Sequence, residues 1–532
     1  MFRRIVGWPT ISLAILGFVI TVGPSRAQQH ETVFCIDDGE KIAAARFEQK
    51  DEKYFLYVDG NAEPLEFAAA RVRGINVDPC PAPAQTSTQV PHFGVHGSNT
   101  IGERLMPMII DAYGEKRFGS PAIHKPGAPE EEEITLKAGD ETKAVIDFHA
   151  HGSGTAPKGL LNGSAVIGMA SRRLKKEEAD AIQARFNVDP LMPGNEHVLA
   201  LDGLAVIVNP ANPIKQLSLE QIARIFSGAV TNWNEVGGED RPITVYRRDD
   251  KSGTYDTFVS LVLSPLNLKI SPSATKFESS EQLSAAVLAD TGGIGFIAVP
   301  YVGKNDALKI ASNCGLTSAP SRFAIKSEEY PLARRLYLYT IGTPSEPVAN
   351  DLLKFALSED AQSIATDAGF YDLSVEFQDD ADQRRWAQDI VENPGEALPP
   401  NKEIPSAAVR YFQKAMDNLR RSSMTFRFAS GSSTLDTRAI QDIDRLANYL
   451  KQPGIAGRRF LIVGFADADG SWSHNQRLAD QRAATVAGLL RKAGAPITRK
   501  NVQSLSYMAP VACNDNDAGK SKNRRVEVWI AP

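Results

Sequence analysis

Between Phe93 and Leu373, short apolar runs that suit β-strands alternate with segments whose apolar residues recur at helical spacing. This alternation is typical of an α/β domain, in which helices cover the faces of a sheet. Residues 198–208 predict a buried strand. Ser218 predicts a helix start because Gln221, three positions later, completes a capping box, and Gly228 is a typical stop for that helix. The pattern places an α/β domain at residues 86–375.

The chain of 532 residues exceeds what one hydrophobic core holds, so further domains are expected on both sides. Residues 28–85 alternate apolar and polar residues in short bursts, and Asp59-Gly60 predicts a hairpin turn there. Residues 376–421 are charged and rich in proline, which indicates a connecting segment with some helix after Ser406. Residues 422–532 predict a final α/β sandwich. The fold class is multidomain, α/β and α+β.

The first 27 residues have the composition of a secretory signal. Arg3 and Arg4 precede an apolar run, residues 11–22, and the small residues Ser25 and Ala27 follow it. The run is shorter than the roughly 20 residues of a membrane span, so an uncleaved anchor is the less favoured alternative. We therefore expect residues 1–27 to be a signal peptide and the remainder to be exported.

Four cysteines fit an oxidising compartment. Cys35 and Cys80 bracket one short segment and are the natural pair. Cys314 and Cys513 lie in different predicted domains, and the sequence leaves the connectivity open. None of the four has CxxC spacing, which disfavours metal or redox chemistry.

The formal net charge of −5 gives no basic surface for nucleic acid. Hydrophobic residues make up 42% of the chain and charged residues 23%, as in ordinary globular proteins. We expect no nucleic-acid partner.

Three segments share one chemistry: residues 97–100, 152–155 and 251–254, each rich in Gly, Ser and Thr. Each follows a predicted strand and precedes a predicted helix, where free backbone N–H groups and the helix dipole favour an anion. Arg248 lies four residues before Ser252 and adds a guanidinium. One such loop is more often an ordinary turn and helix cap, but three in one domain indicate an oxyanion site.

Four segments of this domain resemble periplasmic phosphate-binding proteins: residues 245–254, residues 217–234, Gly152-Ser153 with residues 163–172, and residues 292–296. The resemblance spans residues 93–373 and implies a two-lobed, hinged receptor that closes on phosphate or a related oxyanion. It also implies a periplasmic location and an importer of the ABC class as a partner. Carried over by position, the ligand contacts would be Thr100, Ile101, Ser153, Arg248, Ser252, Gly253 and Thr254.

One position departs from that family. Ser171 stands where many phosphate receptors carry an aspartate that accepts the proton of monohydrogen phosphate. We therefore expect poorer discrimination against sulfate, with Asp249 and Asp250 as candidate substitutes. His96, His149 and His151 lie close to the loops, but no cluster of carboxylate or cysteine ligands accompanies them, so we expect no metal and no cofactor.

In the last domain, Asp467 follows a predicted strand and Arg482 lies on the next predicted helix. Opposite charges at one rim suit a zwitterionic ligand, although a surface ion pair is the equally supported alternative. These residues, with residues 428–435 and 523–527, resemble the OmpA-like peptidoglycan-binding domain. The resemblance implies that Asp467 and Arg482 bind the diaminopimelate of the stem peptide. Residues 505–510 lack the family's usual glycine-bearing turn.

The sequence therefore predicts a binding protein of the cell envelope, associated with peptidoglycan or the outer membrane. An alternative is a structural or adhesion protein whose receptor domain no longer binds anion. A hydrolase with Ser153 or Ser252 as nucleophile is disfavoured, because the chain has no GxSxG elbow. We expect no enzymatic activity.

Overall fold

The structure is a computed structural model that describes residues 32–36, 41–50, 53–58, 63–68, 71–75, 90–250, 252–428 and 435–532. The chain divides into two compact units, Met1–Gln89 and Val90–Pro532. The predicted signal peptide and the Asp59-Gly60 turn lie outside the described residues. No helix in the described ranges is both long and apolar enough to cross a membrane.

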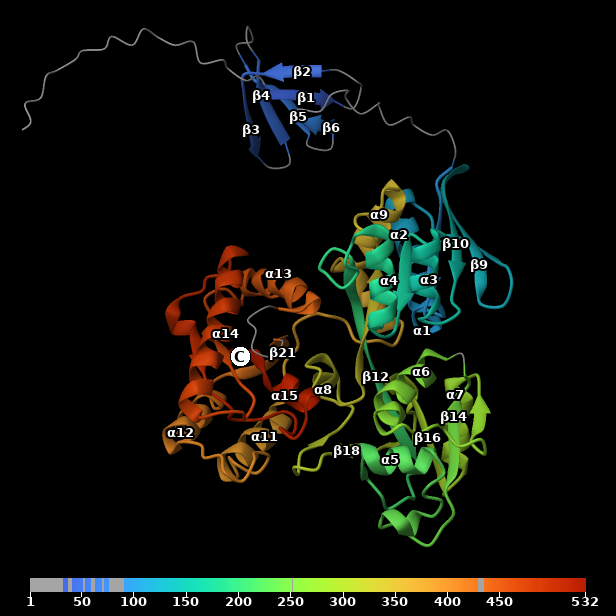
Figure 1. Ribbon diagram of the computed structural model, residues 1–532, viewed down its shortest axis with the longest axis vertical. Coiled ribbons are helices and arrows are strands. Elements are labelled where there is room, and N and C mark those ends of the chain that lie inside the picture. Colours follow the sequence, from blue (N-terminus) through green and yellow to red (C-terminus); the bar gives the residue numbers. More distant parts are fainter. Residues whose placement is uncertain are drawn as a thin grey trace, which may run out of the picture. The chain divides into compact units, whose positions relative to one another are not determined.

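The first unit consists of two small antiparallel sheets (Figure 1). One has the order β2-β1-β6 and the other the order β3-β4-β5. Their bounds are β1 (Thr32–Ile36), β2 (Lys41–Ala44), β3 (Arg46–Lys50), β4 (Lys53–Tyr57), β5 (Leu65–Ala68) and β6 (Val72–Ile75). Cys35 on β1 is disulfide-bonded; its predicted partner, Cys80, lies outside the described residues.

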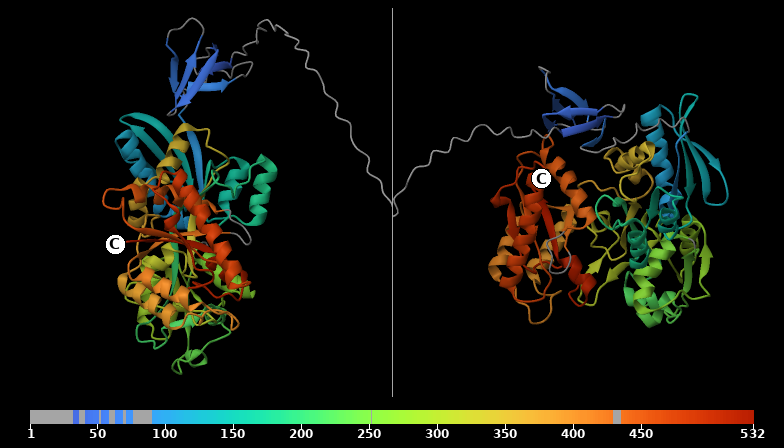
Figure 2. Two further views of the ribbon diagram at one scale, coloured as in Figure 1. Left: turned by 90° about the vertical axis from the view of Figure 1, so that its left-hand side faces the viewer. Right: turned by 45° about the horizontal axis from the view of Figure 1, so that its top comes forward.

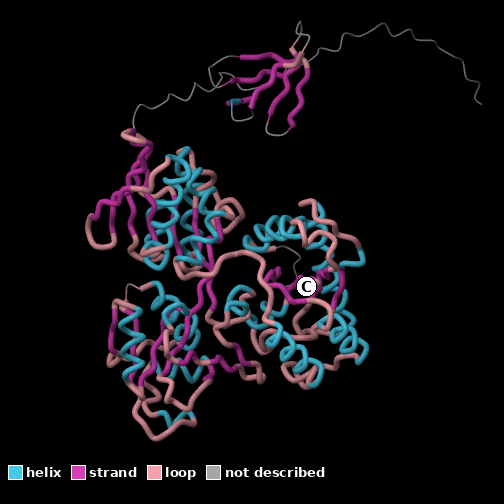
Figure 3. Tube along the Cα trace, turned by 180° about the vertical axis from the view of Figure 1, so that it is seen from behind, coloured by secondary structure: helices cyan, strands magenta, loops and turns pink. Residues whose placement is uncertain are grey.

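Residues 90–375, here called the middle domain, form two lobes that share one continuous sheet (Figures 1 and 3). The strands of the first lobe are β7 (His92–Gly97), β8 (Ile123–Pro126), β9 (Glu131–Ala138), β10 (Glu141–His149), β11 (Ile167–Ala170) and β20 (Ala333–Tyr339). Its helices are α1 (Asn99–Gly102), α2 (Leu105–Phe118), α3 (Thr155–Asn162), α4 (Lys176–Phe186), α9 (Pro347–Ala356) and α10 (Asp360–Asp367).

The second lobe is built mainly from residues 204–332. Its strands are β13 (Gln216–Ser218), β14 (Thr244–Arg248), β15 (Thr275–Phe277), β16 (Gly293–Ala298), β17 (Asp306–Ala307), β18 (Lys309–Ala311) and β19 (Thr317–Ser318). Its helices are α5 (Leu219–Phe226), α6 (Gly253–Phe258), α7 (Ser280–Ala289) and α8 (Arg322–Lys326). The Ser218–Gln221 capping box predicted for α5 is confirmed, and Gly228 follows the helix with a φ of 80°.

Strand β12 (Glu196–Val208) belongs to both lobes. Its first part pairs antiparallel with β20 of the first lobe, and its second part pairs antiparallel with β16 of the second lobe. All thirteen residues of β12 are buried, which confirms the buried strand predicted at 198–208. Strand β12 is therefore a direct covalent connection between the two lobes.

Residues 376–532, here called the terminal domain, form a four-stranded sheet with the order β21-β24-β22-β23. The strands are β21 (Arg420–Arg427), β22 (Phe460–Gly464), β23 (Val502–Ser504) and β24 (Arg525–Ile530). The helices are α11 (Asp380–Glu392), α12 (Ser406–Met416), α13 (Thr437–Lys451), α14 (Trp472–Lys492) and α15 (Asp517–Asn523). Apolar runs in the sequence predict strands at 460–465 and 526–530, and both are confirmed to within one residue.

Successive side chains of β22 point to opposite faces of this sheet, and each face has its own core. Ile462 packs with residues of α13 and α14, whereas Leu461 and Val463 pack with residues of α11 and α12. The sequence predicted a connecting segment with helix after Ser406. In the structure α12 begins at Ser406, α11 precedes it, and both helices cover the sheet (Figure 2).

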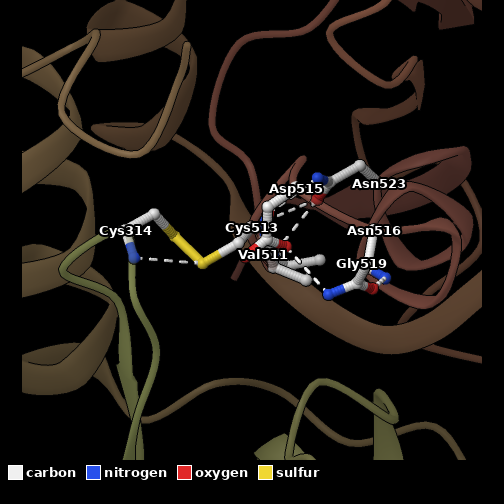
Figure 4. The surroundings of a disulfide bond; sticks show 8 residues. Cys314, Val511, Cys513, Asp515, Asn516, Gly519 and Asn523 are labelled. Atoms are coloured by element: carbon white, nitrogen blue, oxygen red, sulfur yellow. Dashed lines mark hydrogen bonds between the residues drawn. A yellow bond between two sulfur atoms is a disulfide. The ribbon is translucent and has the colours of Figure 1, made fainter.

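The terminal domain is joined to the middle domain by a covalent bond and by buried polar contacts. Cys314 and Cys513, whose connectivity the sequence left open, form a disulfide across a separation of 199 residues (Figure 4). Arg421, on β21, forms ion pairs with both Glu527 and Glu329. The middle and terminal domains therefore belong to one compact unit.

Candidate functional site

Each of the three predicted loops lies at a junction between a strand and a helix, as the sequence predicted, although Lys251 of the third loop lies outside the described residues. The first lies between β7 and α1, the second between β10 and α3, and the third between β14 and α6. Gly152 N–H donates to Gly97 O at 2.7 Å, which joins the second loop to the first. Gly253 N–H donates to Asn99 Oδ1 at 2.9 Å, which joins the third loop to the first across the two lobes.

The first and third loops border a cavity of about 40 Å³. A single water needs roughly 10–15 Å³ of such space, so the cavity has the scale of a few waters or one small ion. Five of the seven predicted anion contacts line it: Thr100, Arg248, Ser252, Gly253 and Thr254. The lining also includes polar residues that the sequence analysis missed, namely Glu103, Arg104, Ser280 and Tyr301.

The other two predicted contacts, Ile101 and Ser153, are buried and are not among the residues that line the cavity. Ile101 packs in the core of the first lobe. Ser153 Oγ accepts a hydrogen bond from Ser171 N at 3.0 Å and lies 3.1 Å from Ser171 Oγ. Ser153 and Ser171 therefore supply each other with hydrogen-bond partners, away from the cavity.

Arg248 provides a positive charge at the cavity. Only 7% of the residue is exposed, and Nη1 donates to Ser280 Oγ at 2.6 Å. The buried Nε has no hydrogen-bond partner within the described structure. A buried charged donor without a partner is costly, and an oxyanion is the kind of group that satisfies it.

Arg334 and Asp202 form a buried ion pair next to the third loop and hold it in place. Arg334 Nε and Nη2 donate to Asp202 Oδ2 at 2.8 and 2.6 Å, and Nη1 donates to Gly253 O at 2.6 Å. Arg334 Nη2 also reaches Thr100 Oγ1 at 3.4 Å. The sequence carried one signal of this pair, because an aspartate inside an apolar strand such as β12 needs a buried partner.

The three histidines lie beside the loops and outside the cavity lining. The rings of His96 and His149 stack at 4.1 Å, and burial, followed by the charge of His149, lowers the pKa of His96 to about 4. His151 is bonded to Glu131 at 2.8 Å, which raises its pKa. Within the described residues, no group of three or more histidine, cysteine or acidic side chains is arranged to hold a metal ion.

In the terminal domain, the structure pairs Asp467 with a residue that the sequence analysis did not single out. Asp467 Oδ2 accepts from Arg524 Nη1 at 2.9 Å, and Oδ1 accepts from Asp469 N at 3.1 Å. Arg482 lies close by and is buried; its Nη1 donates to Phe465 O at 3.5 Å. Burial lowers the pKa of Arg482, the Asp467 carboxylate opposes that shift, and Arg524 adds to it.

Two buried guanidinium groups therefore lie near one carboxylate, and of the two only Arg524 forms an ion pair with it among the described contacts. The Nε atoms of Arg482 and Arg524 are buried and have no hydrogen-bond partner within the described ranges. Asp467 is held in place with lone pairs that Arg524 does not use. The arrangement offers an acceptor for an ammonium group and donors for a carboxylate.

The loop at residues 505–510, which departs from the usual glycine-bearing turn, adopts backbone angles that favour glycine. Ser506 has a φ of 51° and Ala509 a φ of 52°. Both lie in the left-handed region, where side chains other than those of Gly, Asn and Asp are strained. Leu505 N–H donates to Gly464 O at 3.0 Å, so the loop is still held against β22.

Two known families match this chain. The PBP superfamily domain matches residues 132–360, and the OmpA family matches residues 427–524.

Individual proteins match the middle domain. The phosphate-binding protein PstS of Bacillus subtilis (strain 168) is 32% identical over 263 residues, which are 48% of this chain and 81% of the relative. PstS of Pseudomonas aeruginosa (strain PAO1) is 28% identical over 254 residues, 44% of this chain and 76% of the relative. The crystal structure of an ABC-type phosphate transport receptor from Vibrio cholerae aligns with a TM-score of 0.41 and 25% identity, covering 52% of this chain and 99% of that one. This chain therefore belongs, through its middle domain, to the family of PstS phosphate-binding proteins, and it carries an OmpA-family domain at its C-terminal end.

Proposed function

We propose that this protein is a receptor of the bacterial cell envelope that binds phosphate or a similar oxyanion and is held to peptidoglycan by its terminal domain. The observation that carries the first part is Arg248, buried at the cavity with a free donor and surrounded by the Ser252–Thr254 loop. The named function of the PstS relatives supports it. Binding, not catalysis, is the proposed activity, with the periplasm as its location and an ABC importer as the partner.

The anion-binding part is tested by calorimetry with inorganic phosphate on the full-length chain. A charge-assisted hydrogen bond is worth about 1.5–3 kcal/mol, and each 1.4 kcal/mol is tenfold in affinity. Arg248→Ala should therefore weaken binding at least about tenfold. Arg241→Ala removes an exposed arginine from the same lobe, paired with Glu239, and should leave affinity unchanged. Equal affinity in wild type and Arg248→Ala would contradict the assignment.

The wall-binding part is supported by the match to the OmpA family and by the charge arrangement around Asp467. When two charged side chains bind one ligand in a partly buried site, removing either side chain costs about 2–5 kcal/mol of binding free energy. Asp467→Ala and Arg482→Ala should each abolish sedimentation of the full-length chain with purified diaminopimelate-type sacculi. Arg524→Ala should weaken it, because Asp467 loses the partner that fixes it.

A matched control is Asp480→Asn, since Asp480 is a more exposed carboxylate on the same helix as Arg482 and is paired with Arg499. This variant should sediment as wild type does. Circular dichroism of every variant separates loss of binding from loss of folding. If Asp467→Ala and Arg482→Ala still sediment normally, the wall-anchor role is wrong. If the protein sediments but binds no anion, the alternative of a structural envelope protein replaces the receptor role.

A further inference from the structure

The position from which many phosphate receptors recognise the ligand's proton holds no carboxylate in this chain. Ser171 occupies it, and its hydroxyl and backbone N–H are both engaged with the hydroxyl of Ser153. A hydroxyl both donates and accepts hydrogen bonds, whereas an ionised carboxylate only accepts them. Ser171 therefore cannot by itself separate a protonated oxyanion from an unprotonated one.

The two aspartates that the sequence suggested as substitutes are engaged elsewhere. Asp250 accepts from Arg247 at 2.7 Å and from Lys276 at 2.6 Å, on the outside of the lobe. Asp249 Oδ1 accepts from Ser252 N at 3.0 Å. Neither aspartate is among the residues that line the cavity.

Glu103 is the carboxylic acid among the described residues that line the cavity. It directly follows α1 and shares the lining with Arg248, Ser252 and Tyr301. Its side chain has no hydrogen bond or ion pair with the other described residues, so its oxygens are available to a ligand. Glu103 is solvent-exposed, which places it at the mouth of the cavity.

Charges on several surrounding segments act on Glu103. Although Glu103 reaches solvent, the protein atoms around it partly desolvate its carboxyl group and raise its pKa. The Arg248 guanidinium opposes that shift, and the carboxylates of Asp249, Glu130 and Glu281 add to it. Tyr301, on the second lobe, also lines the cavity, and burial followed by the charges of Glu281 and Glu103 raises the pKa of its hydroxyl. The Glu103 carboxyl therefore lies within electrostatic reach of the Arg248 guanidinium, with which it lines the same cavity, and of several other carboxylates.

We propose that Glu103 is the specificity-determining acceptor of this site, which selects an oxyanion that carries a proton, such as monohydrogen phosphate, over sulfate. The proposal rests on the proposed anion-binding function. An ionised Glu103 accepts a hydrogen bond from the P–OH group while Arg248 and the loop donors hold the remaining oxygens. Sulfate has no proton to donate, so its oxygens face the carboxylate without a hydrogen bond and are repelled.

The proposal predicts how selectivity depends on pH. Above the pKa of Glu103 the carboxylate is ionised and selectivity is complete. As the pH falls through that pKa, Glu103 gains a proton that it can donate to sulfate, and selectivity declines. Because the pKa is raised, the decline begins at a higher pH than for an ordinary glutamate.

The test is calorimetric titration of the full-length chain with inorganic phosphate and with sulfate at pH 7.5. Wild type should bind sulfate at least about tenfold more weakly than phosphate, and Glu103→Gln should close that gap to within about threefold by gaining affinity for sulfate. Glu103→Asp should retain part of the preference. Glu281→Gln changes a neighbouring carboxylate outside the lining and should keep the wild-type ratio.

A Glu103→Gln variant that keeps the wild-type ratio of phosphate to sulfate affinity overturns this inference and leaves the anion-binding function intact. A wild-type protein that binds neither anion overturns the proposed function, and this inference with it. The two failures are distinguishable, because the titration of the wild-type protein alone decides whether the proposed anion-binding function is wrong. Equal affinity of wild type for both anions also overturns the inference.

Discussion

Gly253 shows how closely the two lobes approach at the candidate anion site. A Cβ atom added to Gly253 would lie 2.1 Å from Thr100 Oγ1 and 3.1 Å from Ser171 Oγ. Contacts below 3.0 Å force a neighbour to move, and here the neighbour belongs to another loop of the candidate anion site. The residue is therefore required because it lacks a side chain, and its φ is not in the left-handed region.

Gly253→Ala should weaken phosphate binding at least about tenfold, because a displacement of Thr100 by about 1 Å removes aligned hydrogen bonds. Gly154→Ala provides the control, because the nearest atom to its added Cβ is the end of the Arg172 side chain at 4.0 Å. This second variant should bind within about threefold of wild type. Calorimetry with inorganic phosphate measures both, and wild-type affinity in Gly253→Ala would show that the lobes need not meet here.

Glu527 is the centre of a buried charge cluster in the terminal domain. Its carboxylate accepts from Arg421 Nε at 2.8 Å, Arg525 Nε at 2.6 Å and Trp529 Nε1 at 2.8 Å. Burial alone would raise the pKa of Glu527, but the two guanidinium groups outweigh it and hold that pKa well below its usual range. The ionised carboxylate is therefore what neutralises the arginines.

Glu527→Gln should lower the free energy of unfolding at pH 7 by about 3–5 kcal/mol, because it leaves buried arginines short of a counter-charge. A depressed pKa contributes stability above the unfolded pKa of about 4.3, and this is lost as pH falls through the folded pKa. The difference between wild type and variant should thus be the same at pH 7 and pH 5 and should shrink as the pH falls below about 4.3, so that it is smaller at pH 3. Urea denaturation at pH 7, 5 and 3 checks this; a constant difference would contradict it.

The first residue of a helix depends on short-range backbone geometry, and for α14 the sequence pattern predicts the wrong first residue. In the sequence, Ser473 and Gln476, three positions later, have the spacing of a capping box, which predicts the start of this helix at Ser473. In the structure Ser471 is the N-cap, and its Oγ accepts from His474 N at 3.3 Å. Gly470, with a φ of 85°, turns the chain immediately before Ser471, so the helix begins two residues earlier. The spacing rule identified the helix and missed its first residue.

Ser471→Ala should destabilise the protein by about 0.5–2 kcal/mol, because the N-terminal N–H group of the helix loses its acceptor. Ser473→Ala, inside the first turn, should change stability by less than about 0.5 kcal/mol. Urea unfolding of the two variants compares them directly. A larger loss for Ser473→Ala would mean that the predicted cap, and not the observed one, starts the helix.

At the scale of the whole molecule, the terminal domain contacts both lobes of the middle domain. Thr437 Oγ1 donates to Glu196 Oε1 at 2.9 Å, at the start of β12. Arg438 Nη2 donates to Lys326 O at 2.7 Å, at the end of α8. The Cys314–Cys513 disulfide adds a covalent link to the second lobe (Figure 4).

Replacing both members of that disulfide should lower the midpoint of thermal unfolding. Closing a loop of 199 residues restricts the unfolded chain by about 5 kcal/mol in the chain-entropy account, and the measured loss is typically about 2–5 kcal/mol. Cys314→Ser, Cys513→Ser and the double variant should show similar shifts, because each breaks the same bond. Calorimetric scans with no shift in the double variant would show that the noncovalent contacts suffice.

Much of the fold follows from local patterns in the sequence. The buried strand at 198–208, the capping box of α5 and the placement of all three loops between strand and helix depend on residues a few positions apart. Hydrophobic periodicity and helix capping act over that range, so the α/β architecture and the position of Arg248 at a loop were predictable. The structure of residues 376–421 was harder to predict, because the prolines and charged residues in this segment obscure the apolar spacing of α11 and α12.

Only the tertiary structure decided which distant residues meet. Gly253 forms a hydrogen bond with Asn99, 154 positions away in the sequence. The hydrogen bonds of Arg334 with Asp202 and of Arg524 with Asp467 span 132 and 57 positions. Such pairings are set by sheet topology and by the packing of whole elements, which leave no periodic signal in the sequence. The residue types and loops of the candidate sites were therefore determined locally, whereas the choice of Arg524 as the partner of Asp467, the disulfide between Cys314 and Cys513, and the position of Glu103 at the cavity arose from long-range packing.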